Sequence, residues 1–390
     1  MKHLAIATVL LALSVPGRAQ TSYKPQCGGV PVQSIDLSRQ FGPTRCQGQD
    51  GICYSFSAVG AVEAALFRTD GVTRSFDERL AAVLASLDRG EIKARFAAVQ
   101  RSQDANPKIF DGGHPGVVVN AIRKSKIVPP RGFETNTAIW ETIQKTAGDI
   151  SQVKTKDGTV YTAEMYSNDV KLYLKHVPWP LAPQADQEKL GNLSLEQPFD
   201  RRLFGEYRNE GFQISEACEW KGKGAERWQK FADQLTQSLC DGIPVMTSFH
   251  AHRLWTQNPP SKPIRLEDVG QHAAHANILT GLRQVDLGSG KGPQWVFEMR
   301  ESWGAGSPQN PVGSRSYLPL DELCRVFDAS TVVGPWDRKA LKTNSADLAR
   351  QCRVSGATIE CSDIEFAQEP VASSRSGSPT PTPTNTSTGH

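Results

Sequence analysis

The sequence lacks an excess of charge of either sign. It has 44 lysines and arginines against 41 aspartates and glutamates, which leaves a formal net charge of +3 over 390 residues. A protein that binds nucleic acid usually shows a strong basic excess, because lysine and arginine neutralise the phosphate backbone. The composition therefore argues against nucleic acid as a partner.

Long apolar runs are also missing beyond the N-terminus. A transmembrane helix needs about 20 consecutive apolar residues, and no later segment approaches that length. Leu4–Val15 is apolar but short, follows a basic start, and precedes small residues at Gly17 and Ala19. This order is typical of a signal peptide over residues 1–19, the alternative being an anchor that stays attached. We expect no membrane span and a secreted or periplasmic mature protein.

The chain shows no internal repeat, and it ends in a segment of low complexity. Residues 373–390 are mainly Ser, Thr, Pro and Gly, so they cannot bury enough apolar surface to fold and we expect disorder. Residues 20–372 should form one domain. Within it, residues 131–235 are polar and contain several prolines, which indicates a large, partly irregular insertion packed on the core.

Helical patterns come first along the chain, and strand patterns follow. Cys53–Phe67 alternates small and apolar residues without proline and precedes Gly71, which predicts a buried helix. Apolar stripes predict further helices over residues 76–100 and Val117–Lys124. Short apolar or alternating runs predict strands at Pro244–Phe249, Ala276–Leu282 and Gln294–Arg300. This order predicts an α+β fold with a mostly antiparallel sheet.

Eight cysteines are present, namely Cys27, Cys46, Cys53, Cys218, Cys240, Cys324, Cys352 and Cys361. Export permits disulfides, but if one cysteine is a nucleophile, at least one of the other seven is unpaired. Cys352 and Cys361 flank a short segment that contains glycine, which makes them the first candidate pair. Cys218 with Cys240 is the second candidate, and connectivity cannot be deduced from sequence.

The most specific segment is residues 47–58, QGQDGICYSFSA. It resembles the active-site helix of papain-like cysteine peptidases, the cathepsin group, whose local signature is C-G-[SA]-C-[WY]. In Asp50–Tyr54 the glycine, the second cysteine and the aromatic residue match, whereas the first cysteine and the small residue do not. The resemblance implies that Cys53 is the nucleophile, and the alternative is a buried or disulfide-bonded cysteine.

The chemistry of a thiol suits this position. A helix N-terminus stabilises a thiolate, because the backbone N–H groups there lack helical partners and carry partial positive charge. The resemblance also implies that the amide of Gln47 and the backbone N–H of Cys53 donate to the oxyanion formed on attack.

A second segment, Phe110–Pro115 (FDGGHP), resembles the C-x-G-G-x-P segment of the same family. Phe110 and Asp50 stand where two family cysteines normally pair, so that this disulfide is lost as a unit. The resemblance implies that Gly112 and Gly113 bind an extended substrate through their backbone, the alternative being an ordinary turn. It also implies a moderately apolar second subsite lined by His114, Pro115, Ser248 and Ala274.

Two further segments complete the resemblance. His275 precedes alanine and lies six residues before a glycine, as in the family's H-A-V-x-x-x-G strand, which makes it a better base than His272. Arg300–Gly304 (RESWG) resembles the family's N-S-W-G. The resemblance implies that Glu301 replaces the asparagine that orients the histidine and that Trp303 shields this contact. The alternatives are a solvated carboxylate and a core tryptophan.

The four segments occur in the family's order. The resemblance implies a papain-like two-lobed α+β fold, with a helical lobe that carries the nucleophile and an antiparallel sheet or barrel lobe. It implies a cysteine peptidase that works through a thiolate–imidazolium pair and an acyl-enzyme. We expect a monomer that acts on polypeptides without a cofactor or metal, and without the family's long inhibitory propeptide.

Three other interpretations stay open. Glu301 and Ile52 depart from the family, which suits a catalytically impaired protein that only binds peptides. A metal site could be built from His250, His252, His272 and His275, although no H-E-x-x-H pattern or carboxylate at ligand spacing accompanies them. A different Cys–His enzyme, such as a transglutaminase or a cell-wall amidase, also suits an α+β layout.

Overall fold

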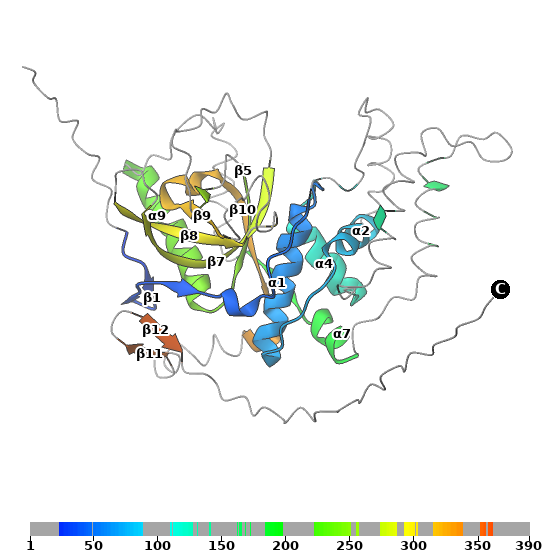
Figure 1. The fold of residues 1–390 in the computed structure, drawn as a ribbon, viewed down its shortest axis with the longest axis horizontal. Coiled ribbons are helices and arrows are strands. Elements are labelled where there is room, and N and C mark those ends of the chain that lie inside the picture. Colours follow the sequence, from blue (N-terminus) through cyan, green and yellow to red (C-terminus); the bar gives the residue numbers. More distant parts are fainter. Residues whose placement is uncertain are drawn as a thin grey trace, which may run out of the picture.

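The computed structural model describes the chain in separate stretches. They are residues 23–48, 50–88, 112–127, 184–197, 222–250, 274–286, 292–300, 315–337, 352–355 and 358–361, with short pieces such as Phe110, Arg131, Trp140, Trp255–Thr256 and Ser302. The predicted signal peptide over residues 1–19 and the tail over residues 373–390 lie outside them. The described part combines helices with an antiparallel sheet (Figure 1), which confirms the α+β class.

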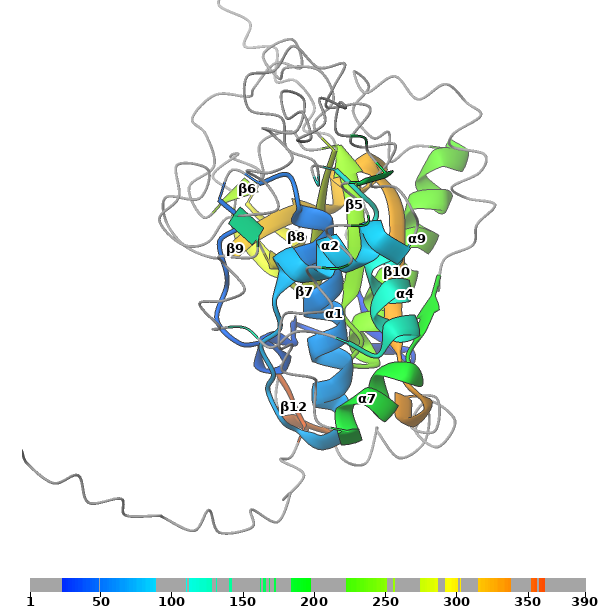
Figure 2. The ribbon, with the colours of Figure 1, turned by 90° about the vertical axis from the view of Figure 1, so that its right-hand side faces the viewer.

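Helices pack on one side of the sheet, as Figures 1 and 2 show from two directions. They are α1 (Cys53–Asp70), α2 (Glu78–Asp88), α4 (Pro115–Ser125) and α7 (Gln184–Gly191). The predicted helices after Cys53 and around Val117 are confirmed. The helix predicted over residues 76–100 is present as α2, and residues 89–100 lie outside the described part.

Helix α1 is the central element of this layer. Nearly all of its side chains between Tyr54 and Leu66 are buried. Its alanines let the sheet and the neighbouring helices approach closely on several sides. Gly71 ends the helix with φ +70°, and its N–H donates to the Phe67 carbonyl. A left-handed C-cap of this kind favours glycine, because other side chains are strained there.

The large sheet has eight strands and is antiparallel throughout the described residues. Its order is β4 (Ser194–Glu196), β10 (Val326–Val333), β5 (Val245–His250), β7 (Ala274–Asp286), β8 (Pro293–Arg300), β9 (Arg315–Pro319) and β6 (Trp255–Thr256), with β3 (Ile35–Asp36) also beside β7. The three predicted strands correspond to β5, β7 and β8 and are confirmed. β7 is the longest and lies at the centre of the sheet.

Two apolar clusters lie on opposite faces of this sheet. One joins α1, α2 and α4 to Met246, Ala276 and Ile278. The other packs Phe249 and Leu279 against α9 (Gly222–Cys240) and the β8–β10 region. Neighbouring residues of β7 thus contribute to different clusters, because side chains alternate across a strand.

Parts of the predicted insertion over residues 131–235 belong to this core. α7 packs on α1 and α4, and β4 extends the sheet beside β10. α9 begins within the segment and continues past residue 235. The insertion therefore contributes to both sides of the fold.

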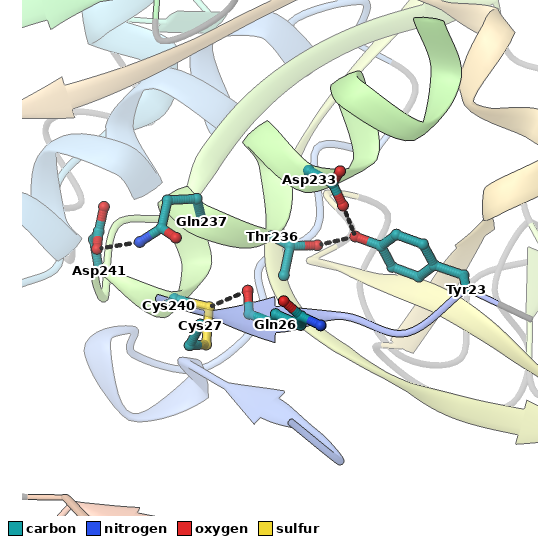
Figure 3. Close-up of a disulfide and its surroundings, with 8 residues drawn as sticks. All are labelled: Tyr23, Gln26, Cys27, Asp233, Thr236, Gln237, Cys240 and Asp241. Atoms are coloured by element: carbon teal, nitrogen blue, oxygen red, sulfur yellow. Dashed lines mark hydrogen bonds between the residues drawn. A yellow bond between two sulfur atoms is a disulfide. The ribbon is translucent and has the colours of Figure 1, made fainter. Parts of the chain in front are cut away.

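A disulfide joins the N-terminal stretch of the chain to helix α9 (Gly222–Cys240). Cys27 in β1 (Gln26–Cys27), which pairs with β2 (Val30–Pro31), is bonded to Cys240 at the end of α9, 213 residues later (Figure 3). The predicted Cys218–Cys240 pair is therefore wrong. The partner of Cys240 depends on where the N-terminal segment lies against α9, and no local sequence pattern indicates this.

A short hairpin near the C-terminus bears on the other cysteine prediction. In β11 (Cys352–Ser355) and β12 (Thr358–Cys361), Cys352 stands directly opposite Cys361. The backbone register suits the predicted bond, which stays a prediction because these side chains lie outside the described part.

Among the helices of the described part, none is both long and apolar enough to cross a membrane.

Candidate active site

Cys53 is the first residue of α1 and is half-buried. Ile52, in the N-cap position, is fully buried and has no polar side chain to cap the helix. The first N–H groups of a helix have no helical acceptors. In the absence of a side-chain cap they can stabilise a negative charge on the Cys53 sulfur.

His275 is the second residue of β7 and is about 5% exposed. It stands opposite Phe249 of β5, and the two rings meet edge to face with centroids 5.8 Å apart. This contact places the imidazole on the same face of the sheet as Phe249, which belongs to the apolar cluster that includes α9.

The side chains of Cys53 and His275 are joined by a hydrogen bond. Burial alone would raise the pKa of the Cys53 thiol. The hydrogen bond and the charge of His275 oppose that effect, with help from backbone N–H groups of Ala276 and Tyr54, and the net result is a lowered pKa. A thiol with a lowered pKa beside a histidine is an activated nucleophile.

One helical turn after Cys53, a buried hydrogen bond joins α1 to β7. The Ser57 hydroxyl donates to the Asn277 carbonyl at 2.8 Å. Ser57 lies four residues after Cys53, and Asn277 lies two after His275. Because both bonded residues are close to the reactive pair, this bond sets the helix in register with the strand. Sequence analysis did not assign a role to either residue.

Gln47 is buried and held from two sides. Its Nε2 donates to the Asp50 carbonyl at 2.8 Å, and its Oε1 accepts from the Ser302 hydroxyl. Its backbone N–H donates to the Ser302 carbonyl at 2.6 Å. An amide nitrogen has two N–H groups, so the bond to Asp50 leaves one for a ligand. Ser302 is thus a positioning residue that sequence analysis missed, although it lies inside the RESWG segment.

The glycine pair is tied to the loop before the nucleophile. The Gly112 N–H donates to the Gly51 carbonyl at 2.8 Å, and the Tyr54 hydroxyl donates to the Phe110 carbonyl at 3.1 Å. These two bonds join the segments around Asp50 and Phe110, the two positions where the family that the sequence resembles has paired cysteines.

Both glycines have a structural reason to be glycine. Gly112 has φ +73°, which other residues rarely adopt. A Cβ on Gly113 would lie 2.6 Å from the Tyr54 ring. The following residues, His114 and Pro115, form the N-cap and the first turn of α4. The glycine pair is therefore shaped by the fold and contacts Gly51 and Tyr54, two residues before and one residue after Cys53.

A buried group of charges lies beneath the loop that carries Gln47. Arg45 contacts Glu63 of α1 at 2.7 Å and also pairs with Glu78 of α2. Arg300, at the end of β8, donates to the Pro43 carbonyl at 2.6 Å. Burial, reinforced by the charge of Arg45, lowers the pKa of Arg300 to about 10. This network joins the Gln47 loop to α1, α2 and the strand that precedes Glu301.

The side chains of Cys53 and His275 meet directly, whereas Gln47 and Gly112 bond to the backbone of the loop before Cys53 and Gly113 lies against the Tyr54 ring. Glu301, Trp303 and His272 lie outside the described residues, and for Ala274 only the backbone is described. The predicted catalytic and substrate-binding roles of all these residues, His114 and Pro115 included, stay predictions. Among the residues that the structure describes, no three His, Cys, Asp or Glu side chains gather as a metal site requires, but the side chains of His250, His252 and His272 lie outside them.

Comparisons with known proteins complete the description of the site. No protein-family model matches the sequence, and a search of curated proteins found no significant match.

Proposed function

We propose that this protein is an exported cysteine peptidase with a papain-like fold, in which Cys53 is the nucleophile and His275 is the base. The observation that carries the proposal is the hydrogen-bonded pair of these side chains. The thiol stands at the N-terminus of a buried helix, the imidazole comes from the adjoining strand, and the thiol pKa is lowered.

The reaction begins with attack of the Cys53 thiolate on the carbonyl carbon of a peptide bond. The tetrahedral oxyanion is stabilised by the Cys53 backbone N–H and by the Gln47 amide. The C–N bond breaks as the His275 imidazolium gives its proton to the leaving amine, and a thioester remains on Cys53. His275 then takes a proton from water, whose oxygen attacks the thioester and releases the acid and the thiolate.

The surroundings of the pair support this assignment. Gly112 and Gly113 contact residues on either side of Cys53. In this proposal their backbone binds the extended chain of the substrate. Glu301 follows β8 and is the proposed orienting partner of His275, with Trp303 as its shield. The Cys27–Cys240 disulfide suits an oxidising compartment, in agreement with export by a signal peptide.

The test is covalent labelling with a peptidyl epoxide under reducing conditions. We expect modification at Cys53 that is lost in Cys53→Ala and in His275→Ala. Cys46 is the matched control, because it is a second free cysteine in the described part and is exposed. Cys46→Ala should label like the parent protein. Absence of labelling in the parent would contradict the proposal and favour a protein that binds peptides without cleaving them.

A further inference from the structure

An aromatic ring on the strand beside β7 contacts the proposed base. Phe249 of β5 stands directly opposite His275, and the two ring planes meet at 89° with their centroids 5.8 Å apart. Aromatic pairs favour this edge-to-face arrangement at centroid distances of about 4.5–7 Å. Both side chains are buried. The reaction proposed above assigns no role to Phe249.

The Cys53 thiol contacts the same imidazole from helix α1. The thiol and the imidazole are joined by a hydrogen bond, and the sulfur also accepts one from the N–H of Ala276, the residue after His275. The imidazole is therefore restrained by two elements, by the thiol at the start of α1 and by the phenyl ring on β5.

A histidine ring needs such contacts to keep one orientation. Rotation about its Cβ–Cγ bond is only weakly restricted, because that bond joins an sp³ carbon to an sp² carbon. The hydrogen bond to Cys53 favours one direction, but a bond to a single atom leaves the ring plane free to tilt about it. Proton transfer requires the ring nitrogen to stay within hydrogen-bond reach of the sulfur. A second contact on the ring therefore bears directly on the proposed chemistry.

Phe249 is itself firmly placed. Its side chain is 2% exposed, and it stands opposite Val326 of β10, which is 1% exposed. It belongs to the apolar cluster that includes Phe231 and Leu235 of α9. Side chains in a close-packed interior have little room to shift. The imidazole thus meets a ring that cannot move without disturbing a second strand and a helix.

This restraint bears on the ionisation of the thiol. Burial raises the pKa of Cys53, and the hydrogen bond and the charge of His275 oppose this effect and leave a net lowering. An imidazole that tilts away opposes burial less, so the pKa of the thiol should rise. Less thiolate is then present at acid pH, and the thiolate is the form that reacts.

We propose that Phe249 is a positioning residue of the candidate active site, whose ring keeps the His275 imidazole directed at the Cys53 thiol. The inference rests on the proposed function, because it assigns this residue to the proposed reaction. It adds an aromatic residue that lies in none of the four segments that resemble the peptidase family.

The test measures how fast iodoacetamide labels Cys53 in the full-length protein between about pH 5 and pH 9. Cys46, the exposed free cysteine of the described part, is the internal reference in the same mass spectrum. Phe249→Leu removes the ring and keeps an apolar side chain. We expect the Cys53 rate at acid pH to fall by roughly 3- to 10-fold, the range for one aromatic pair. The rise of the rate with pH should move to higher pH.

Two further variants separate positioning from packing. Phe249→Met fills the space with a flexible apolar chain that has no ring, and it should behave as Phe249→Leu does. The matched control is Phe231→Leu in α9. Phe231 is also 2% exposed and belongs to the same cluster, but its ring meets Trp228, with centroids 6.2 Å apart. This control should lose stability on heating and keep the parent's pH profile.

The outcomes separate this inference from the proposed function. If both Phe249 variants keep the acid-pH rate within about twofold of the parent's, or if Phe231→Leu lowers it equally, only the inference fails. If His275→Ala leaves the parent's profile unchanged, the inference and the peptidase proposal fail together. If the profile depends on both His275 and Phe249 while the peptidyl epoxide does not label the parent, the positioning of the pair is supported and the peptidase proposal fails.

Discussion

The two sides of the candidate site are held together by different kinds of interaction. On the helical side, Arg45 pairs with Glu63 and Glu78 in a buried ionic network under the nucleophile helix. On the sheet side, apolar packing on α9 is supplemented by the Cys27–Cys240 disulfide. Cys53, the proposed nucleophile, and His275, the proposed base, therefore lie in regions held by different interactions, one by buried ion pairs and the other by a disulfide.

The largest expected effect is on the helical side. Glu63 is 1% exposed, and its carboxylate accepts bonds from Arg45 at 2.7 and 2.9 Å and from the Phe76 N–H at 2.8 Å. Glu63→Gln should lower the free energy of unfolding by about 3 kcal/mol or more, because it removes one of the two carboxylates that pair with the buried Arg45. Urea unfolding measures this loss.

The control for Glu63 is a carboxylate in a surface pair. Asp88 of α2 pairs with Lys124, whose side chain is 71% exposed. Asp88→Asn should cost less than about 1 kcal/mol. Equal losses in the two variants would show that burial does not distinguish the network from an ordinary surface ion pair.

A smaller effect is expected on the sheet side. Replacing both Cys27 and Cys240 by serine should lower the free energy of unfolding by about 2–4 kcal/mol, because the closed loop no longer restricts the unfolded chain. Thermal unfolding with and without a thiol reductant measures it. The parent should lose stability on reduction and the double variant should not. A parent protein that is insensitive to reduction would argue against this bond.

A further effect on the helical side is the pH dependence of stability that Glu78 introduces. Burial raises the pKa of Glu78 from 4.5 to about 7, against the opposing charges of Arg45 and Arg131 and with the charge of Glu63 adding to the rise. The folded protein therefore binds a proton more tightly than the unfolded chain. The stabilisation is complete below pH 4.5 and is lost as the pH rises through 7.

This dependence is checked by unfolding the parent and Glu78→Gln across that pH range. The parent should lose stability relative to the variant as the pH rises, since glutamine carries no titrating proton. Parallel curves for the two proteins would contradict the assignment. In the variant with serine at both Cys27 and Cys240, the free energy of unfolding should change with pH as it does in the parent. This result would separate the pH effect of Glu78 from the effect of the disulfide.

The parts of the fold that could be predicted are those set by local pattern. The run of small and apolar residues after Cys53, followed by Gly71, predicts α1. Close packing requires small side chains in the helix itself, and a left-handed C-cap favours glycine directly after it. Alternation similarly predicts β8. The meeting of Cys53 with His275 also followed from the sequence, through motifs in a recognisable order.

The parts that could not be predicted depend on contacts between distant residues of ordinary type. The partner of Cys240 lies 213 residues away, and no local pattern connects them. Asp328 of β10 has no motif around it, and its contact with His114, 3.4 Å from the Nε2 atom to a carboxylate oxygen, follows from the order of the strands in the sheet. Ser57 and Ser302 have no distinctive sequence pattern around their hydroxyl groups. Their positioning roles depend on distant acceptors, the Asn277 carbonyl and the Gln47 side chain. The roles of Glu301 and Trp303 stay predictions.

The bond between Gln47 and Ser302 has a consequence for biosynthesis. The two residues are 255 positions apart, and His275 too comes from the later part of the chain. A nascent chain that has emerged only as far as α1 has the thiol but neither its base nor a positioned amide donor. The proposed active site is therefore complete only after β7 and β8 have joined the sheet, so the order of synthesis would delay the activity proposed for it.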